Sequence, residues 1–431
     1  MVLVLLIIRK SYHSLMLKSK IWKISKWILG LIGIYFFCTL LYFGYSEVDE
    51  KKGVYTYYWS GIQALFNNTE FGISDNKYLD TKFDGLDGPY ISDGFRYDVS
   101  AQNKLIKTPI SPGEEFIVAV GNKAVPGFKV KLRNSYATAD HIYKRPEKLI
   151  AISDIEGNFI GFYSFLISNK VIDQQGNWIY GKGHLVLNGD FVDRGNQVTQ
   201  VLWLIYKLEQ QAETAGGKVH YILGNHEIMM LQGNVSYANF KYIEAAKRIS
   251  GVKFWDQATR SLYAENTELG TWLRSKNIVE RIGENLFVHA GMNIRHVNEN
   301  LDIKKLNQIA KANYGKPYTN NFINASEEMT LSGIYAPYWD RSLAMDFKNK
   351  MLYFLNNVKA KETTQLDLEK ICRYYQVSRI IIGHSIVNDI RTDYDGKVIK
   401  IDVHHGTSMR SGKTKGIILQ GNRAIKVDDA I

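Results

Sequence analysis

The longest uninterrupted apolar stretch of the chain lies near its N-terminus. From Trp27 to Tyr45 there is no charged residue for 19 positions. At about 1.5 Å per helical residue, a stretch of this length nearly crosses a bilayer hydrocarbon core of about 30 Å. The pattern therefore predicts a transmembrane anchor over residues 27–45.

The charges around this stretch predict its orientation. Lys and Arg crowd a basic segment, 1–26, which holds no acidic residue, whereas Glu47, Asp49 and Glu50 follow the stretch. The positive-inside rule places the basic segment in the cytoplasm and the rest of the chain on the non-cytoplasmic side of a single-pass membrane protein. A cleaved signal peptide is the alternative, although no clean small-x-small site follows the apolar residues. Met16 is an alternative start.

Residues 46–147 follow another pattern. Tyr, Phe and Val alternate there with Gly, Asp and Asn in short bursts such as YISDGFRYDV and EEFIVAVGN. Such bursts are typical of short strands joined by turns. The segment is predicted to be a β-rich extension that spaces or packs the following domain, and it shows no chemistry of its own.

One pattern then repeats six times between Leu149 and Val403: a short β-branched, apolar run followed at once by a polar residue. Unbroken apolar runs of this length are typical of strands buried on both faces of a sheet. Polar residues just past such strands gather at one edge of an α/β sheet. The polar residues that end the six runs are Asp154, Asp190, Asn225, His289, His384 and Asp402.

A helix is predicted between the second and third of these runs. Apolar residues recur there at helical spacing, and the pattern ends at two glycines. The positions are Val198, Val201, Leu202, Ile205 and Leu208, followed by Gly216 and Gly217. Alternation of strand, helix and strand predicts an α/β domain over residues 148–431.

The polar residues at the ends of the strands offer carboxylate, carboxamide and imidazole groups. This set can hold two divalent cations, which together serve phosphoester hydrolysis by polarising the phosphoryl group and activating water. The candidate ligands are Asp154, Glu156, Asp190, Asn225, His289 and His384. Arg194 can bind phosphate oxygens through the N–H groups of its guanidinium. His226 can protonate a leaving alkoxide, and Asp193 can orient the His226 imidazole.

The same residues carry a resemblance to a known family. The ordered motifs resemble those of the calcineurin-like metallophosphoesterase superfamily, especially its serine/threonine phosphoprotein phosphatase branch. They are DIEGN at 154–158, GDFVDRG at 189–195, GNHE at 224–227, VHAG at 288–291 and GHS at 383–385. The resemblance covers about residues 148–427. It implies a four-layer metallophosphoesterase fold, in which two mixed β-sheets pack together and helices flank them.

The resemblance also implies roles for individual residues. The first metal falls to Asp154, position 156 and Asp190. The second falls to Asp190, Asn225, His289 and His384. His226 with Asp193 becomes the catalytic acid pair, and Arg194, Asn225 and Arg341 become phosphate-binding residues, the last on a short match in APYWDR.

Two positions depart from the family pattern. Glu156 stands where the family has the histidine of Asp-x-His, and Ile386 stands where many members have the second histidine of Gly-His-x-His. A carboxylate-rich first site favours Mn²⁺ or Mg²⁺ relative to Zn²⁺. We therefore expect two divalent ions, with Mn²⁺ favoured and Fe, Zn²⁺ or Mg²⁺ as alternatives. His404 or His405 could supply a missing nitrogen.

Composition narrows the function classes. The chain is 45% hydrophobic and 23% charged, which is typical of folded proteins. Six of its eleven net positive charges lie in the basic segment 1–26, so no basic stripe remains and no nucleic-acid partner is expected. Two cysteines, Cys38 and Cys372, cannot form a disulfide framework. Oligomeric state is open.

These patterns together predict a membrane-anchored dimetal phosphatase. It would hydrolyse phosphomonoesters, either a phosphoprotein or a small phosphate ester, by attack of a metal-activated hydroxide. One alternative is hydrolysis of dinucleoside polyphosphates or phosphodiesters. Another is a family member that binds phosphate without turning it over.

Overall fold

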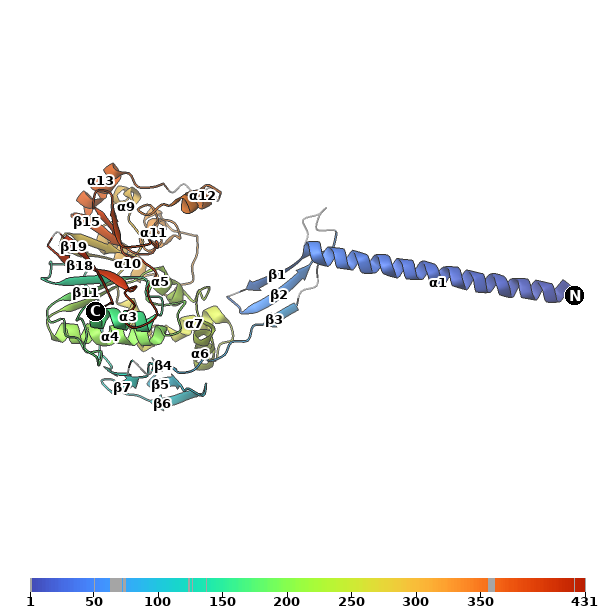
Figure 1. Cartoon of the computed structure of the whole chain (residues 1–431), viewed down its shortest axis with the longest axis horizontal. Coiled ribbons are helices and arrows are strands. Elements are labelled where there is room, and N and C mark those ends of the chain that lie inside the picture. The colour runs from blue at the N-terminus through green and yellow to red at the C-terminus, as the bar shows by residue number, and fades with distance from the viewer. Residues whose placement is uncertain are drawn as a thin grey trace. The chain divides into compact units, whose positions relative to one another are not determined.

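The structure is a computed structural model that describes residues 2–49, 51–62, 72, 75–122, 125, 127–136, 138–355, 361–421 and 423–430. The chain divides into two compact units, 1–80 and 81–431 (Figure 1). Each unit is described by itself.

The first unit consists of one long helix and a small sheet. Helix α1 (Val2–Phe43) leads into the antiparallel strands β1 (Gly44–Asp49), β2 (Val54–Trp59) and β3 (Asp75–Tyr78). Within α1, Met16–Leu41 is the one stretch in the described part of the chain that is long and apolar enough to cross a membrane. A signal sequence passes the same test. The helix ends two residues before the predicted end of the anchor, because Gly44 and Tyr45 pair with β2.

The second unit begins with the small strands of the predicted extension. Strands β4 (Asp87–Ser92), β5 (Phe95–Val99) and β6 (Leu105–Pro109) form an antiparallel sheet, and β7 (Glu115–Val118) pairs with β8 (Phe128–Lys131). Strand β9 (Ile142–Tyr143) joins a sheet of the α/β domain. The described strands of this segment are thus short and joined by turns.

The boundary between the units differs from the predicted domain boundary at 147. Helix α4 (Val198–Thr214) explains the difference, because it buries its side chains against these small strands. The Trp203 indole donates a hydrogen bond to the Pro89 carbonyl (2.8 Å), and its ring lies 5.0 Å from that of Phe116. Residues 81–147 therefore share one hydrophobic core with the α/β domain, 148–431.

Two mixed sheets form the centre of the second unit. The first has the order β12-β11-β10-β18-β19, and the second has the order β16-β17-β15-β14-β13-β9. Their strands are β10 (Leu149–Ile152), β11 (His184–Asn188), β12 (Lys218–Ile222), β13 (Val279–Ile282), β14 (Asn285–Val288), β15 (Arg379–Ile382), β16 (Arg391–Asp393), β17 (Val398–Lys400), β18 (Lys415–Gln420) and β19 (Arg423–Asp428). All six predicted strands and the predicted helix are confirmed.

Alternating residues of these strands build two apolar layers. Ala151, Val186, Phe287 and Ile381 pack together between the sheets, where side chains from both sheets meet. Ile150 belongs instead to the larger core under the helices. Because both faces of the central strands are covered, apolar residues occur there at consecutive positions, as in Leu149–Ile152.

Helices cover the outer faces of the sheets. On the first sheet α4 packs on β12, and on the second α10 (Ile303–Lys311) packs on β13. The remaining described helices of this unit are α3 (Phe159–Ser168), α5 (Asn225–Gln232), α6 (Phe240–Ser250), α7 (Trp255–Leu262), α8 (Glu268–Arg274), α9 (Ile294–Asn298), α11 (Ala325–Leu331), α12 (Phe347–Leu355) and α13 (Gln365–Tyr375). The predicted four-layer fold of two mixed sheets between helices is confirmed.

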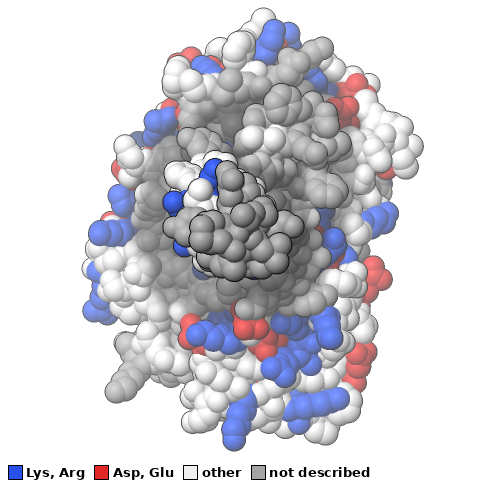
Figure 2. Space-filling view, turned by 90° about the vertical axis from the view of Figure 1, so that its right-hand side faces the viewer, with Lys and Arg blue, Asp and Glu red and all other residues white. Residues whose placement is uncertain are grey.

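The surface carries both signs of charge. Figure 2 shows Lys and Arg side chains interspersed with Asp and Glu over the described part of one face. Several of the charged side chains are paired, as in the ion pairs of Asp389 with Lys415 (2.9 Å) and Lys426 (2.8 Å).

Candidate active site

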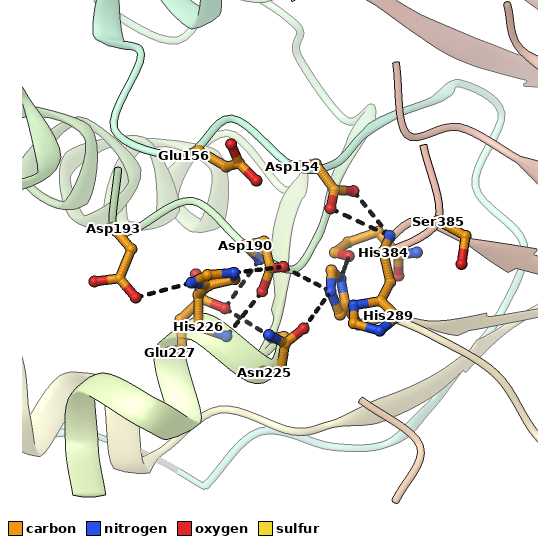
Figure 3. Close-up of polar contacts among 12 residues, drawn as sticks. Asp154, Glu156, Asp190, Asp193, Asn225, His226, Glu227, His289, His384 and Ser385 are labelled. Atoms are coloured by element: carbon orange, nitrogen blue, oxygen red, sulfur yellow. Dashed lines mark hydrogen bonds and ion pairs between the residues drawn. The ribbon is translucent and has the colours of Figure 1, made fainter. Parts of the chain in front are cut away.

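The ends of neighbouring strands bring the predicted site residues together. Asp154 and Asp190 lie two residues beyond the parallel strands β10 and β11, and Asn225 begins α5 just after β12. In the second sheet, His289 follows β14 directly and His384 lies two residues beyond the parallel strand β15. Parallel strands end at the same edge of a sheet, and Figure 3 shows the five side chains converging there.

The backbone is unusual at this edge. Six residues with side chains have positive φ angles between 50° and 67°, a conformation that is uncommon for residues other than glycine. They are Asp154, Glu156, Asp190, Asp193, Arg194 and His384. Such strain costs of order 1–3 kcal/mol per residue and clusters at functional sites. The tight loops aim short polar side chains inward.

Asp190 lies at the centre of the group, between His226 and His289 (Figure 3). Its Oδ2 atom is 2.9 Å from His289 Nε2 and 3.8 Å from His226 Nε2. Ligand atoms of Asp190, His289 and His384 all lie within 4.8 Å of one another. A carboxylate and two imidazoles at this spacing can bind one divalent cation.

His289 is fixed by its second ring nitrogen. Its Nδ1 donates a hydrogen bond to the carbonyl of Asn188 (2.8 Å), so Nε2 points toward Asp190 and toward Asn225 Oδ1, 3.1 Å away. Burial opposes protonation of this imidazole, but Asp190 and Asp154 raise its pKa to about 10. The site therefore has a strong preference for positive charge at this position.

His384 supplies the clearest sign of a cation site. Its Nε2 is buried and has no hydrogen-bond partner among the described residues. Burial first, and then the charge of Arg341, hold the pKa of His384 well below its usual range, so the imidazole is neutral. A buried, neutral nitrogen without a partner is costly unless it binds something. The donor set of His384, His289 and Asp190 fits a divalent metal ion.

Asp154 approaches from the other side of the group. Its two carboxylate oxygens accept from the backbone N–H of His384, both at 3.2 Å. Burial and the negative charge of Asp190 raise the pKa of Asp154 to about 7, against the opposing effect of His289. A cation beside the two carboxylates would remove this repulsion.

Glu227 holds the loops of the site together, a role that we did not predict from the sequence. Its carboxylate accepts hydrogen bonds from the N–H groups of Asp190 (3.0 Å), Phe191 (2.7 Å) and Gly224 (2.7 Å), and from the Tyr221 hydroxyl (2.9 Å). The sequence indicated Glu227 only through its position as the last residue of the GNHE motif. Glu227 joins the loop after β11 to the loop after β12.

His226 and Asp193 form the predicted pair. Nδ1 of His226 lies 2.8 Å from Oδ2 of Asp193, and the imidazole packs on the Tyr237 ring at 5.0 Å. Burial lowers the pKa of His226, but the charges of Asp190 and Asp193 outweigh it and raise the pKa. The imidazole is therefore suited to hold a proton next to the cation site.

The predicted phosphate-binding arginines lie on two sides of this group. Arg194 stacks on Tyr237, 5.1 Å from the ring centroid, and forms an ion pair with Glu156. Arg341 donates to the Ser385 hydroxyl (3.0 Å) and lies 3.4 Å from the His384 carbonyl. Both guanidinium groups are thus held next to predicted metal ligands.

His405 does not supply the missing imidazole, because both of its ring nitrogens are used elsewhere. Nε2 donates to the carbonyl of Ser153 (2.8 Å), and Nδ1 accepts from the N–H of Lys415 (3.4 Å). His404 is exposed. The suggestion that His405 is a ligand was wrong, since the strand-end backbone takes its nitrogens.

The aromatic residues of the long segments between motifs mostly pack in the core. Trp255, Trp272 and Tyr338 are at most 3% exposed. Trp339 is the exception, because its ring lies 5.5 Å from that of His384 and forms part of the wall of the site.

Comparison with known proteins agrees with this geometry. The family model described as "Calcineurin-like phosphoesterase" matches residues 147–388. The chain is 35% identical over 102 residues to Shewanella-like protein phosphatase 2 of Arabidopsis thaliana, which is 24% of this chain and 26% of that protein. It is 37% identical over 116 residues to Shewanella-like protein phosphatase 1 of Plasmodium berghei, 27% of this chain and 32% of that protein. The matches span about a quarter to a third of these two relatives.

A solved structure is similar over most of the chain. The crystal structure of a cold-active protein-tyrosine phosphatase from a psychrophilic Shewanella species superposes with a TM-score of 0.66 at 29% sequence identity. The superposition covers 80% of this chain and 98% of that one.

Proposed function

The chain belongs to the calcineurin-like phosphoesterase family, and from this premise we propose that it is a metal-dependent phosphatase that hydrolyses phosphomonoesters. The observation that carries the proposal is the group of Asp190, His289 and His384. His384 Nε2 is buried without a hydrogen-bond partner among the described residues, and Asp190 lies 3.8 Å from His226 of the His226–Asp193 pair. A cation site next to a proton donor is the arrangement that phosphoester hydrolysis needs.

Two divalent cations fit the donor set. Asp154, Glu156 and Asp190 would hold the first, and Asp190, Asn225, His289 and His384 would hold the second. When bound, such ions supply Lewis acidity toward the phosphoryl oxygens and lower the pKa of water. Because the first set is all carboxylate, we propose Mn²⁺ as the preferred ion.

The protein's own residues then bind the phosphate and move the proton. Arg194 and Arg341 would donate hydrogen bonds to the phosphoryl oxygens from two sides, with Asn225 between them. His226, whose pKa is raised by Asp190 and Asp193 against burial, would give its proton to the leaving oxygen. Asp193 would keep the imidazole oriented through Nδ1.

The names of the relatives support a protein substrate. They are called protein phosphatases, and the Shewanella structure is called a protein-tyrosine phosphatase. We therefore propose phosphorylated proteins as the substrate class. Small phosphate esters are the alternative for a domain outside the cytoplasm, where phosphoproteins are scarcer.

The proposal includes a membrane anchor. The stretch Met16–Leu41 is long and apolar enough to span a bilayer, and the basic residues before it favour a cytoplasmic N-terminus. Protease added to intact spheroplasts would then digest the second unit. Protection of that unit would contradict the orientation, and loss of residues 1–45 from the mature protein would indicate a cleaved signal.

The activity is tested with the full chain purified in detergent, stripped of metal and reloaded with Mn²⁺, Mg²⁺ or Zn²⁺. We expect metal-dependent hydrolysis of p-nitrophenyl phosphate and of phosphotyrosyl peptides, and its loss in Asp190→Asn. A folded, metal-loaded protein that hydrolyses neither substrate would contradict the proposal.

A further inference from the structure

Asp402 reaches the same edge of the second sheet as the predicted ligands, although it has no role in the family pattern. It lies two residues beyond β17, which runs parallel to β15 and so ends at the edge where His384 lies. Its carbonyl accepts from the N–H of Val387 (2.9 Å), which ties it to the loop that carries His384. The fold therefore places Asp402 at the edge of the sheet that carries the site.

Asp402 is a buried residue whose carboxylate has no polar partner among the described residues. Asp402 is 6% exposed, and its side chain makes no hydrogen bond or ion pair with any other residue in the described ranges. Asp429, a comparably buried residue, accepts from the backbone N–H groups of Ser411 and Thr414 and from the Ser411 hydroxyl. A buried carboxylate without such donors is costly unless a cation or a proton neutralises it.

The backbone places Asp402 on the Asp154 side of the group. The N–H of Ile401 donates to the carbonyl of Ile382 (2.9 Å), and a Cβ on the next residue, Gly383, would contact the Asp154 carboxylate. Three buried carboxylates, those of Asp154, Asp190 and Asp402, form an environment that a divalent cation would stabilise.

Among the described residues, no imidazole nitrogen is available as a ligand on this side of the group. Position 156 is a glutamate that pairs with Arg194, position 386 is an isoleucine that is 52% exposed, and His405 has both nitrogens engaged. His384 and His289 lie with Asp190 on the other side. A further carboxylate there would complete a set of oxygen ligands.

We propose that Asp402 is a further metal ligand of the first cation, in addition to Asp154, Glu156 and Asp190, and that this oxygen-only set selects Mn²⁺ or Mg²⁺ over Zn²⁺. The inference rests on the proposed function for the presence of two cations. Its structural basis is independent of turnover, since it depends on the strand order, the burial of Asp402 and its lack of a partner. Hard divalent cations prefer such oxygen ligands.

Metal binding provides the test. Full-length protein stripped of metal is titrated with Mn²⁺ by isothermal calorimetry, and bound metal is counted by mass spectrometry after dialysis. We expect two ions in the wild type. In Asp402→Asn one ion should bind with unchanged affinity and the other at least tenfold more weakly. The matched control Asp429→Asn, which also removes a buried carboxylate, should keep both ions.

Wild-type affinity for both ions in Asp402→Asn would overturn the inference, and would leave Asp402 as a protonated neighbour of Asp154. Two bound ions without phosphatase activity in the wild type would instead contradict the proposed function, while the Asp402 titration would still be decisive. The two failures are therefore distinguishable.

A second variant covers the case in which Asp402→Asn does not fold. Asp402→Cys replaces the hard oxygen with a soft thiolate, which should raise the affinity for Cd²⁺ relative to Mn²⁺ by at least tenfold. It should also add an ultraviolet charge-transfer band from sulfur to Cd²⁺ that the wild type, with Cys38 and Cys372, lacks. A folded variant that binds Cd²⁺ without this band would overturn the inference.

Discussion

His226 Nδ1 lies 2.8 Å from the Oδ2 atom of Asp193, while the opposite ring nitrogen of His226 faces Asp190, 3.8 Å away. One carboxylate thus orients the imidazole, and a second carboxylate attracts its proton toward the predicted cation site. In the proposed function, this arrangement would hold a proton on Nε2, from which the leaving group could take it.

The effect of replacing His226 on turnover should depend on the leaving group of the substrate. In His226→Asn we expect the turnover of a phosphoserine peptide to fall by about 10²–10⁴, because an alkoxide needs a proton to leave. Turnover of p-nitrophenyl phosphate should fall much less, since nitrophenolate leaves without one. Steady-state kinetics with the two substrates checks this. Equal losses on both would mean that His226 acts in binding.

Asp193→Asn should reproduce part of that effect. The amide can keep a hydrogen bond to Nδ1 but not the charge that helps to raise the pKa of His226. We expect a smaller loss of turnover than in His226→Asn, with an unchanged KM. A measured loss that is additive in the double variant would contradict a shared role, because residues that act as a unit are not additive.

Glu227→Gln should weaken the hydrogen bonds that hold the loops of the predicted metal site in place. The amide is nearly isosteric, but its NH₂ group would face backbone N–H donors that the carboxylate now accepts. We expect a loss of about 2–4 kcal/mol in the free energy of unfolding and a 10–100-fold weaker Mn²⁺ affinity. Urea denaturation and metal titration measure the two effects. Tyr221→Phe, which removes one hydrogen bond to Glu227, is the control and should cost about 1 kcal/mol.

Gly189 is placed where a side chain has no room. Its φ is +89°, and an added Cβ would contact Nδ1 of His289. Gly189→Ala should therefore displace His289 and weaken Mn²⁺ binding in addition to destabilising the fold. Gly181→Ala is the matched control, since Gly181 has a φ of +59° and open space around it. It should lose only about 1 kcal/mol of stability and keep its metal affinity.

Protonation of His405 should make the fold sensitive to acid. Burial lowers the pKa of His405 to about 4, and the hydrogen bond to the Ser153 carbonyl opposes this shift only in part. The folded protein thus holds fewer protons than the unfolded chain, whose histidine has a pKa of about 6.5. The stabilisation is complete above pH 6.5 and is lost as the pH falls toward 4.

The size of this loss is roughly 2–3 kcal/mol by linkage. Urea denaturation from pH 7 to 4 should show it, and His405→Gln, whose amide can still donate to Ser153, should show a shallower slope. An identical pH dependence in the variant would mean that other groups cause the acid sensitivity.

The sequence by itself determined the elements and most of the candidate chemistry. Runs such as LIAI at 149–152 and III at 380–382 are apolar at every position because both of their faces are buried, and this local property identifies strands without any tertiary information. The spacing of apolar residues likewise predicted α4. The polar residue at the end of each run was visible because it interrupts the pattern.

Only the tertiary structure decided how distant groups meet. Three features of the site join groups that are separated in the sequence. They are the ion pair of Arg194 with Glu156, the hydrogen bonds of both His405 ring nitrogens to the backbone, and the four hydrogen bonds to Glu227. Several of the loops involved have unusual backbone conformations. The unit boundary near residue 80 likewise follows from Trp203 packing against Phe116 and Pro89. Local patterns report which face of an element is buried, but the partner that covers it depends on the whole chain.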